Sequence, residues 1–333
     1  MLRHTMRTLL VGLCSLTAAS QAATAVALAT PADQHRATHT AARALHAQTL
    51  SDLTTAMKGE AYANASYSLF AAQADGQDQP TAGKLVRRNH PAVGELFRTT
   101  AQTELDEHLR EAATLAGVVG TNAANLRQSI NGESYEHQVM YRGFAAQARK
   151  DGDLKAADLF TEIAADEGRH RDAYRTALTV LTTGRGTVPA PPTAKPVSVP
   201  AGLPKVKAAR TRTNLGTAMH GEALARAKYM LFAAHAKQTG QPALARLFEG
   251  TAGVELNEHF AGEAVLAGLV RTTKTNLRTA ITGERAEAAT LYPGFAQRAT
   301  AVGDAAVARY FRDTAADEAR HAAAFQQALD QLR

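Results

Sequence analysis

The sequence has 333 residues, few aromatic residues, no tryptophan and one cysteine, Cys14. This length favours two domains over one, and the alanine-rich composition favours an all-α protein. The formal charge of +6 is too mild to indicate a nucleic-acid partner. A single thiol excludes an intrachain disulfide, a thiolate zinc site and an iron tetrathiolate.

Residues 1–29 are predicted to form a secretory signal. Basic residues come first, an apolar run follows, and the small residues that end in Ala-Leu-Ala suit cleavage near Ala29. The alternatives are an uncut membrane anchor or a buried helix, but the run is short and diluted with Thr, Ser and Gln. We therefore expect an exported protein with no membrane span after processing. Residues 30–49 are expected to be a solvated leader, because no framework of acids surrounds His35, His39 and His46.

The remaining chain is predicted to contain two copies of one domain, 50–182 and 211–333, joined by a linker rich in Pro and Gly at 183–210. The segment "LTTAMKGEAYANASYSLFAAQA" matches "LGTAMHGEALARAKYMLFAAHA", and Glu60 and Glu222 are 162 residues apart. Later matching positions are 151 apart, so the first copy has eleven extra residues between its first two helices. A duplicated domain tolerates such an insertion in a loop.

Each copy contains four apolar-periodic segments of about 25 residues, separated by short breaks such as "KDGD". Segments of this length suit a four-helix bundle in each copy. In the first copy the predicted helices are 50–76, 92–118, 123–149 and 153–181.

Every predicted helix carries glutamate, and in the first copy helices two and four also carry His108 and His170. Residues three or four apart share a helix face, so Glu167 and His170 can project together. A lone glutamate on a bundle helix is usually solvated, but four carboxylates and two imidazoles inside one bundle would repel unless cations neutralised them. Oxygen donors mixed with imidazoles favour iron or manganese over calcium or zinc. The first copy carries Glu60 on helix one, Glu104, Glu107 and His108 on helix two, Glu133 and Glu136 on helix three, and Glu167 and His170 on helix four.

Each copy resembles the ferritin-like domain of rubrerythrin. In that family helices one and three bear Gly-Glu followed later by Tyr, as in "KGEAYANASYSLFA" and "NGESYEHQVMYRGFA", and helices two and four bear Glu with a nearby His. The resemblance implies two tandem ferritin-like four-helix bundles with two iron ions each, manganese being the alternative. The implied ligands are Glu60, Glu104, His108, Glu133, Glu136, Glu167 and His170 in the first copy, and Glu222, Glu255, His259, Glu284, Glu287, Glu318 and His321 in the second.

The resemblance also implies roles for residues beyond the shared carboxylates. Glu136 and Glu287 match the family's extra carboxylate on helix three, which makes room for an iron that moves with its redox state. Four tyrosines are implied to hydrogen-bond ligand carboxylates and so to orient them, the alternative being an ordinary aromatic core contact. These tyrosines are Tyr67, Tyr141, Tyr229 and Tyr292.

Helix two departs from the family pattern of Glu-x-x-His. In "ELDEH" and "ELNEH" the first Glu and the His are four residues apart. A one-residue insertion in a helix is most easily absorbed as a π-bulge, which would keep Glu104 and Glu255 as ligands. The alternative is that Glu107 or Glu258 replaces its neighbour, since residues four apart also share a face.

Three functions follow as expectations. The first is reduction of hydrogen peroxide or dioxygen, with electrons from an external donor because the rubredoxin module of the family is missing. The second is a ferroxidase or iron-binding protein without sustained turnover. The third is a structural bundle that binds stray metal, which the complete ligand sets argue against.

Overall fold

The structure, a computed structural model, describes residues 44–76 and 89–332. Within these ranges the chain forms helices and no strand, which confirms the all-α prediction. None of the helices described is long and apolar enough to cross a membrane. Three predicted segments lie wholly or mostly outside the described residues. They are the signal at 1–29, the leader at 30–49 and the insertion between the first two helices of the first copy.

The helices of the first copy match the four predicted segments, with π-helical turns in two of them. The first helix begins after His46, whose Nδ1 accepts a hydrogen bond from the backbone N–H of Gln48. The last ends at Gly184, which adopts the left-handed conformation typical of a helix C-cap. The elements are α1 (Ala47–Ala74), α2 (Pro91–Thr103), η1 (Glu104–Leu109), α3 (Arg110–Leu115), α4 (Asn122–Tyr135), η2 (Glu136–Met140), α5 (Tyr141–Lys150) and α6 (Leu154–Thr183).

The second copy repeats this order. Proline occupies the first turn of its second helix, as it does in the first copy, where a missing backbone N–H costs nothing. The elements are α7 (Ala209–Gln238), α8 (Pro242–Val254), η3 (Glu255–Phe260), α9 (Ala261–Ala267), α10 (Thr273–Ala286), η4 (Glu287–Leu291), α11 (Tyr292–Ala301) and α12 (Ala305–Gln331).

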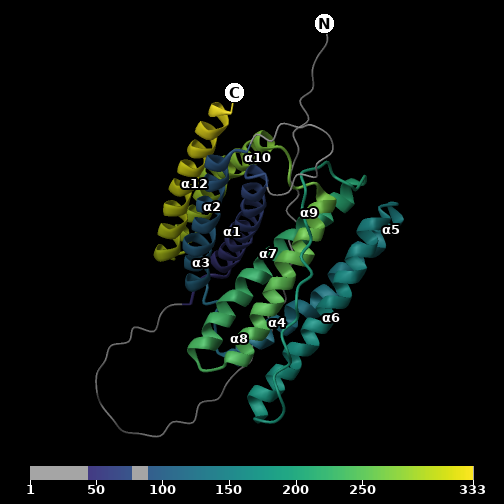
Figure 1. Ribbon diagram of the computed structural model, residues 1–333. Helices are drawn as coiled ribbons and strands as arrows, with labels where there is room; N and C mark the ends of the chain where they lie inside the picture. Colours follow the sequence, from purple (N-terminus) through teal and green to yellow (C-terminus); the bar gives the residue numbers. More distant parts are fainter. Residues whose placement is uncertain (1–43, 77–88, 333) are drawn as a thin grey trace, which may run out of the picture. The chain divides into compact units, whose positions relative to one another are not determined.

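The helices do not group by copy. Helices α1 to α3 pack with α10 to α12, and this group is called bundle A (Figure 1). Helices α7 to α9 pack with α4 to α6, and this group is called bundle B. The expectation that 50–182 and 211–333 each form their own bundle is therefore wrong. Each bundle combines the first helix pair of one copy with the second helix pair of the other.

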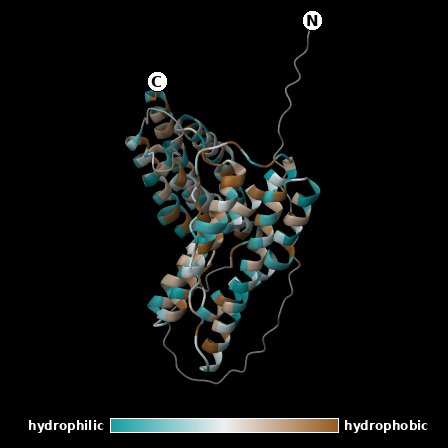
Figure 2. Cartoon of the chain, turned by 45° about the vertical axis from the view of Figure 1, so that its right-hand side comes forward, coloured by the Kyte–Doolittle hydropathy of each residue, from teal (hydrophilic) through white to brown (hydrophobic). Residues whose placement is uncertain are grey.

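Both bundles have cores built from aromatic residues and alanines. Phe70, Phe97 and Phe325 lie close together in bundle A, and Phe97 and Phe325 have ring centroids 4.9 Å apart. Phe232 and Phe248, the counterparts of Phe70 and Phe97, have ring centroids 5.6 Å apart in bundle B. Alternation of hydrophobic and hydrophilic residues along the helices keeps these rings inside (Figure 2). Many of the other buried positions are alanine.

The two bundles meet along α1 and α7. Met219, Ala223 and Ala227 of α7 belong to the same buried cluster as Met57 and Ala61 of α1. Small side chains let two helix backbones approach closely. Beside this contact the Tyr62 ring stacks on His220, with ring centroids 3.9 Å apart and planes 6° apart.

The segment that was predicted as a linker is extended, as expected, but it packs along bundle B. Between Gly184 and Ala208 it forms neither helix nor strand. The backbone N–H of Val197 donates to the Asn257 carbonyl at 2.8 Å, and that of Lys205 donates to the Leu266 carbonyl at 2.8 Å. Its end is held by Asp153, whose carboxylate accepts from the backbone N–H groups of Lys207 and Ala208.

Candidate metal centres

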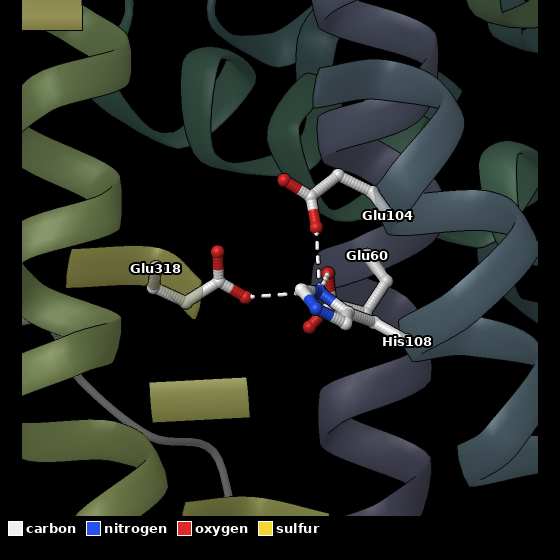
Figure 3. A group of neighbouring side chains, drawn as sticks. All are labelled: Glu60, Glu104, His108 and Glu318. Atoms are coloured by element: carbon white, nitrogen blue, oxygen red, sulfur yellow. Dashed lines mark hydrogen bonds and ion pairs between the residues drawn. The ribbon is translucent and has the colours of Figure 1, made fainter. Parts of the chain in front are cut away.

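Bundle A gathers six predicted ligands around its axis. They form two overlapping groups, and in each group the potential ligand atoms all lie within 4.8 Å of one another. Figure 3 shows one group, in which Glu318 of α12 reaches toward Glu60, Glu104 and His108 from the opposite side of the bundle. Because Glu104 and Glu318 belong to both groups, each can bridge two metal ions. The groups are Glu60, Glu104, His108 and Glu318, and Glu104, Glu284, Glu318 and His321.

Bundle B repeats this arrangement with six other predicted ligands. Here Glu167 and Glu255 belong to both groups, so they take the bridging positions. The carboxylates of both are 1% exposed. The groups are Glu133, Glu167, His170 and Glu255, and Glu167, Glu222, Glu255 and His259.

Every centre draws its ligands from both copies of the repeat. The residue types implied by the resemblance are all present, but their grouping by copy is wrong. Glu60 and Glu104 meet Glu284 and Glu318, not Glu133 and Glu167. Constant spacing between the copies identified equivalent positions, but it could not show which equivalent positions share a bundle.

The predicted π-bulge in helix two is confirmed in both copies. The π-helical turns η1 and η3 begin at Glu104 and Glu255. Nδ1 of His108 lies 2.7 Å from Oε2 of Glu104, so the bulge brings both side chains to one face. Glu107 is exposed, and Glu258 accepts a hydrogen bond from the backbone N–H of Lys195 at 2.9 Å. The alternative in which Glu107 or Glu258 enters the centre is therefore wrong.

All four histidines direct Nδ1 at the carboxylates. Nδ1 of His170 lies 2.9 Å from Glu167 and 3.2 Å from Glu255. On two histidines the opposite nitrogen faces an aspartate that the sequence analysis missed. Nε2 of His108 lies 3.4 Å from Asp317, and Nε2 of His259 lies 3.6 Å from Asp166. A carboxylate on the outer nitrogen fixes ring orientation and tautomer, and the repeated "ADE" before each Arg-His was the available signal.

The four predicted tyrosines each donate a hydrogen bond to a ligand carboxylate. Tyr67 donates to Oε1 of Glu284 at 2.5 Å. The other three pairs are Tyr141 with Glu222, Tyr229 with Glu133, and Tyr292 with Glu60. In every pair the tyrosine comes from one copy and the glutamate from the other. These bonds confirm that the tyrosines orient the carboxylates and that the bundles are built from both copies.

Glu136 and Glu287 lie beside the glycines that precede two ligand glutamates. A Cβ placed on Gly59 would lie 3.5 Å from Oε1 of Glu287, and one on Gly221 would lie 3.6 Å from Oε1 of Glu136. Both distances are ordinary van der Waals contacts, so each extra carboxylate lies directly against the opposite helix at the glycine of the Gly-Glu motif. Both acids begin a π-helical turn, η2 or η4, that was not predicted. Neither acid is part of the four-residue groups.

Burial and repulsion between acids perturb the pKa values of the centres strongly. Burial, with the charge of Glu167 nearby, raises the pKa of Glu222 to about 8. Burial raises the pKa of Glu284 to about 9 in spite of a hydrogen bond with His321. Although burial opposes it, hydrogen bonds with His108 and His321 lower the pKa of Glu318 to about 2. Carboxylates held this close at neutral pH call for protons or cations between them.

The donor set fits metal cations. Buried carboxylate oxygens that make no hydrogen bond within the described residues occur in both bundles, on Glu104, Glu133, Glu167, Glu255, Glu284 and Glu318. Native proteins rarely leave buried acceptors unsatisfied. Oxygens that point at a shared centre beside imidazole nitrogens are what a pair of transition-metal ions requires.

Bundle B contains one further buried acid. Glu263 of α9 is 0% exposed, and its Oε1 lies 3.0 Å from the Tyr141 hydroxyl. Burial, with the charge of Glu222 nearby, raises the pKa of Glu263 well above its ordinary value. The position 151 residues earlier is Ala112, so bundle A has no counterpart. Sequence reasoning missed Glu263 because it compared only positions that both copies share.

Each bundle has four helices, of which two supply one Glu each and two supply a Glu with a His. This arrangement defines the ferritin-like carboxylate di-metal class. A family model for rubrerythrin matches residues 51–178 and 253–329. The chain belongs to the rubrerythrin family, whose members bind iron.

Curated relatives carry the same family name. The chain is 36% identical over 129 residues to rubrerythrin of Porphyromonas gingivalis, and the match covers 35% of this chain and 64% of that protein. It is 33% identical over 132 residues to rubrerythrin of Nitratidesulfovibrio vulgaris, covering 36% and 69%, and 30% identical over 133 residues to nigerythrin of the same organism, covering 39% and 65%. The chain thus spans slightly under two thirds of the length of some relatives. The comparison with solved structures gave no significant match.

Proposed function

We propose that each bundle binds two iron ions and that the protein reduces hydrogen peroxide or dioxygen in oxidative-stress defence. The observation that carries the proposal is the pair of complete ligand sets, each with two carboxylates placed to bridge and two histidines directed inward. Manganese is the alternative metal for the same donors. Iron, when bound, supplies the electrons that break the O–O bond.

The chain's own residues position and protect such a centre. In bundle A, Glu104 and Glu318 span both metal positions, while Glu60 and Glu284 each serve one. Tyr292 and Tyr67 hold those two outer carboxylates by hydrogen bonds. Buried rings such as Phe97 keep water away from one end of the site. Glu287, which lies against Gly59, is the side chain that could follow a change in metal position.

Reduction of one peroxide molecule to two waters consumes two electrons and two protons. Cys14 is the single cysteine in these 333 residues, so they cannot build the tetrathiolate iron site of a rubredoxin module. We therefore propose that electrons come from an external donor.

The test is to load the protein anaerobically with Fe(II) and to follow peroxide consumption with and without a supplied reductant. Sustained consumption that requires the reductant supports a peroxidase. Consumption that stops after the bound iron is oxidised supports the second candidate, a ferroxidase or iron-binding protein, which the proposed export and the lack of a built-in donor in these 333 residues favour. No iron binding and no consumption would leave only a structural bundle.

The proposed location is outside the cytoplasm, with the signal removed near Ala29. The order of basic, apolar and small residues at 1–29 supports this. N-terminal sequencing of the protein purified from its native host tests it. A mature chain that begins close to Thr30 is expected, and an intact Met1 on the functional protein would refute it.

A further inference from the structure

A cavity of about 230 Å³ reaches Glu287 beside the centre of bundle A. Helices α1 and α10 supply most of its walls, and His220 of α7 and Leu269 complete them. Tyr62, Phe70 and Ala280 make much of the lining aromatic or aliphatic. The cavity also touches Tyr67, whose hydroxyl holds the ligand Glu284 at 2.5 Å. It therefore leads from the surface between the bundles to residues that contact the metal ligands.

The lining selects by size and charge. Among the described residues, the lining contains one carboxylate, Glu287, and no lysine or arginine. An anion entering it would meet that carboxylate and would lose its hydration against apolar walls. A small uncharged molecule avoids both costs, and apolar cavities of this size accept uncharged guests such as xenon.

The matching place in bundle B differs at several lining positions, and the largest change puts a long cationic residue where bundle A has a small one. Ser66 lines the cavity, and the residue 162 positions later is Lys228. Nζ of Lys228 lies 6.0 Å from the ring centroid of Phe232, which is the counterpart of Phe70 in the cavity wall. Lys228 also lies close enough to Glu136, the counterpart of Glu287, for their charges to interact. The lysine side chain therefore lies beside the counterparts of two residues, Phe70 and Glu287, that border the cavity in bundle A.

We propose that this cavity is the entry subsite for a small uncharged oxidant at the bundle A centre, and that Lys228 closes the corresponding entry to bundle B. The two centres are then unequal, with bundle A reacting first. The identity of the guest rests on the proposed function, whereas the difference between the two cavities does not.

The first experiment uses the metal-free full-length protein and xenon as the probe. Crystals pressurised with xenon should show an atom beside Phe70 and Tyr62 in bundle A and none beside Phe232 in bundle B. The Lys228→Ser variant should gain a second xenon site in bundle B. Xenon in both bundles of the wild type, or in neither bundle of either protein, would overturn the inference whatever the iron chemistry proves to be.

The second experiment uses the Fe(II)-loaded protein and the absorbance of the oxidised centres after one addition of hydrogen peroxide. Wild type should oxidise in two phases of similar amplitude whose rates differ by at least tenfold. Lys228→Ser should merge them by speeding the slow phase, while Arg226→Ser, two residues away on the same helix, should not. A single phase in the wild type would refute unequal entry. Absence of any oxidation, with the xenon pattern as expected, would instead refute the proposed function.

Discussion

The exchange of helix pairs between copies predicts opposite results for two matched double variants. Glu104→Ala with Glu318→Ala removes residues from different copies but from one bundle. Glu104→Ala with Glu167→Ala removes residues from one copy but from different bundles. Both variants lose two buried bridging carboxylates, so they differ only in where the losses fall.

The structure sets the size of each effect. In the first variant both four-residue groups of bundle A fall to one glutamate and one histidine each, while bundle B keeps all its ligands. In the second variant every group in both bundles loses one carboxylate. Loss of a residue that only hydrogen-bonds to a metal ligand weakens metal binding about 10- to 100-fold. Loss of the ligand itself should weaken binding at least as much. From a wild type with about four irons, the first variant should keep about two tight irons and the second close to none.

The assay is iron content after anaerobic loading and passage over a column that contains a chelator. Glu107→Ala with Glu162→Ala is the control, because both acids are exposed and it should retain the wild-type iron content. If bundles formed within each copy, the second variant would keep about two tight irons and the first would keep close to none. That reversed pattern would refute the exchanged arrangement.

Three further predictions follow from contacts in and around the centres. Without metal, the free energy of unfolding should fall as pH rises from about 5 to about 9. The reason is that Glu222, Glu284 and Glu287 have folded pKa values of about 8, 9 and 8, so the native state binds their protons more tightly than the unfolded state does. Thermal melting across that pH range checks this, and bound iron should make the stability less dependent on pH. Tyr292→Phe should weaken iron binding at bundle A about 10- to 100-fold through loss of its bond to Glu60, whereas the exposed Tyr135→Phe should change nothing in the same chelator competition. Asp153→Ala should destabilise the protein by about 1–3 kcal/mol in urea unfolding because the backbone N–H groups of Lys207 and Ala208 lose their acceptor, and the exposed Asp158→Ala is the control that should leave the midpoint unchanged.

The sequence predicted the helices and the chemistry of the centres because both depend on local patterns. The 3.6-residue periodicity located all four helices of the first copy to within a few residues. The extra residue between Glu104 and His108, relative to the Glu-x-x-His pattern of the family, predicted the π-turn, because a π-bulge absorbs a one-residue insertion. Asp166 and Asp317 were missed although the repeated "ADE" marks them, and Glu263 was missed because only positions shared by both copies were compared.

The pairing of helices could have been predicted from loop lengths, and comparing the repeats alone concealed it. A ferritin-like bundle needs one long crossover between its two helix pairs. Six residues, 116–121, join α3 to α4. Such a loop spans at most about 22 Å when fully extended, whereas the 25 residues of α2 to α3 extend about 37 Å. The third helix of the first copy therefore cannot return along its own first pair in the ferritin-like order.

The same argument gives the proline-rich segment its structural role. Bundle B is built from elements that are consecutive in the chain, the pair formed by α4 to α6 and then the pair formed by α7 to α9. Residues 184–208 therefore connect its two helix pairs. Twenty-five extended residues can reach about 80 Å, which is more than the length of the bundle. The hydrogen bonds of Val197 and Lys205 to Asn257 and Leu266 show this segment running along the second helix of the pair. It is thus the long crossover of bundle B. Prolines suit this extended segment because it is not part of a sheet and therefore uses few backbone N–H donors.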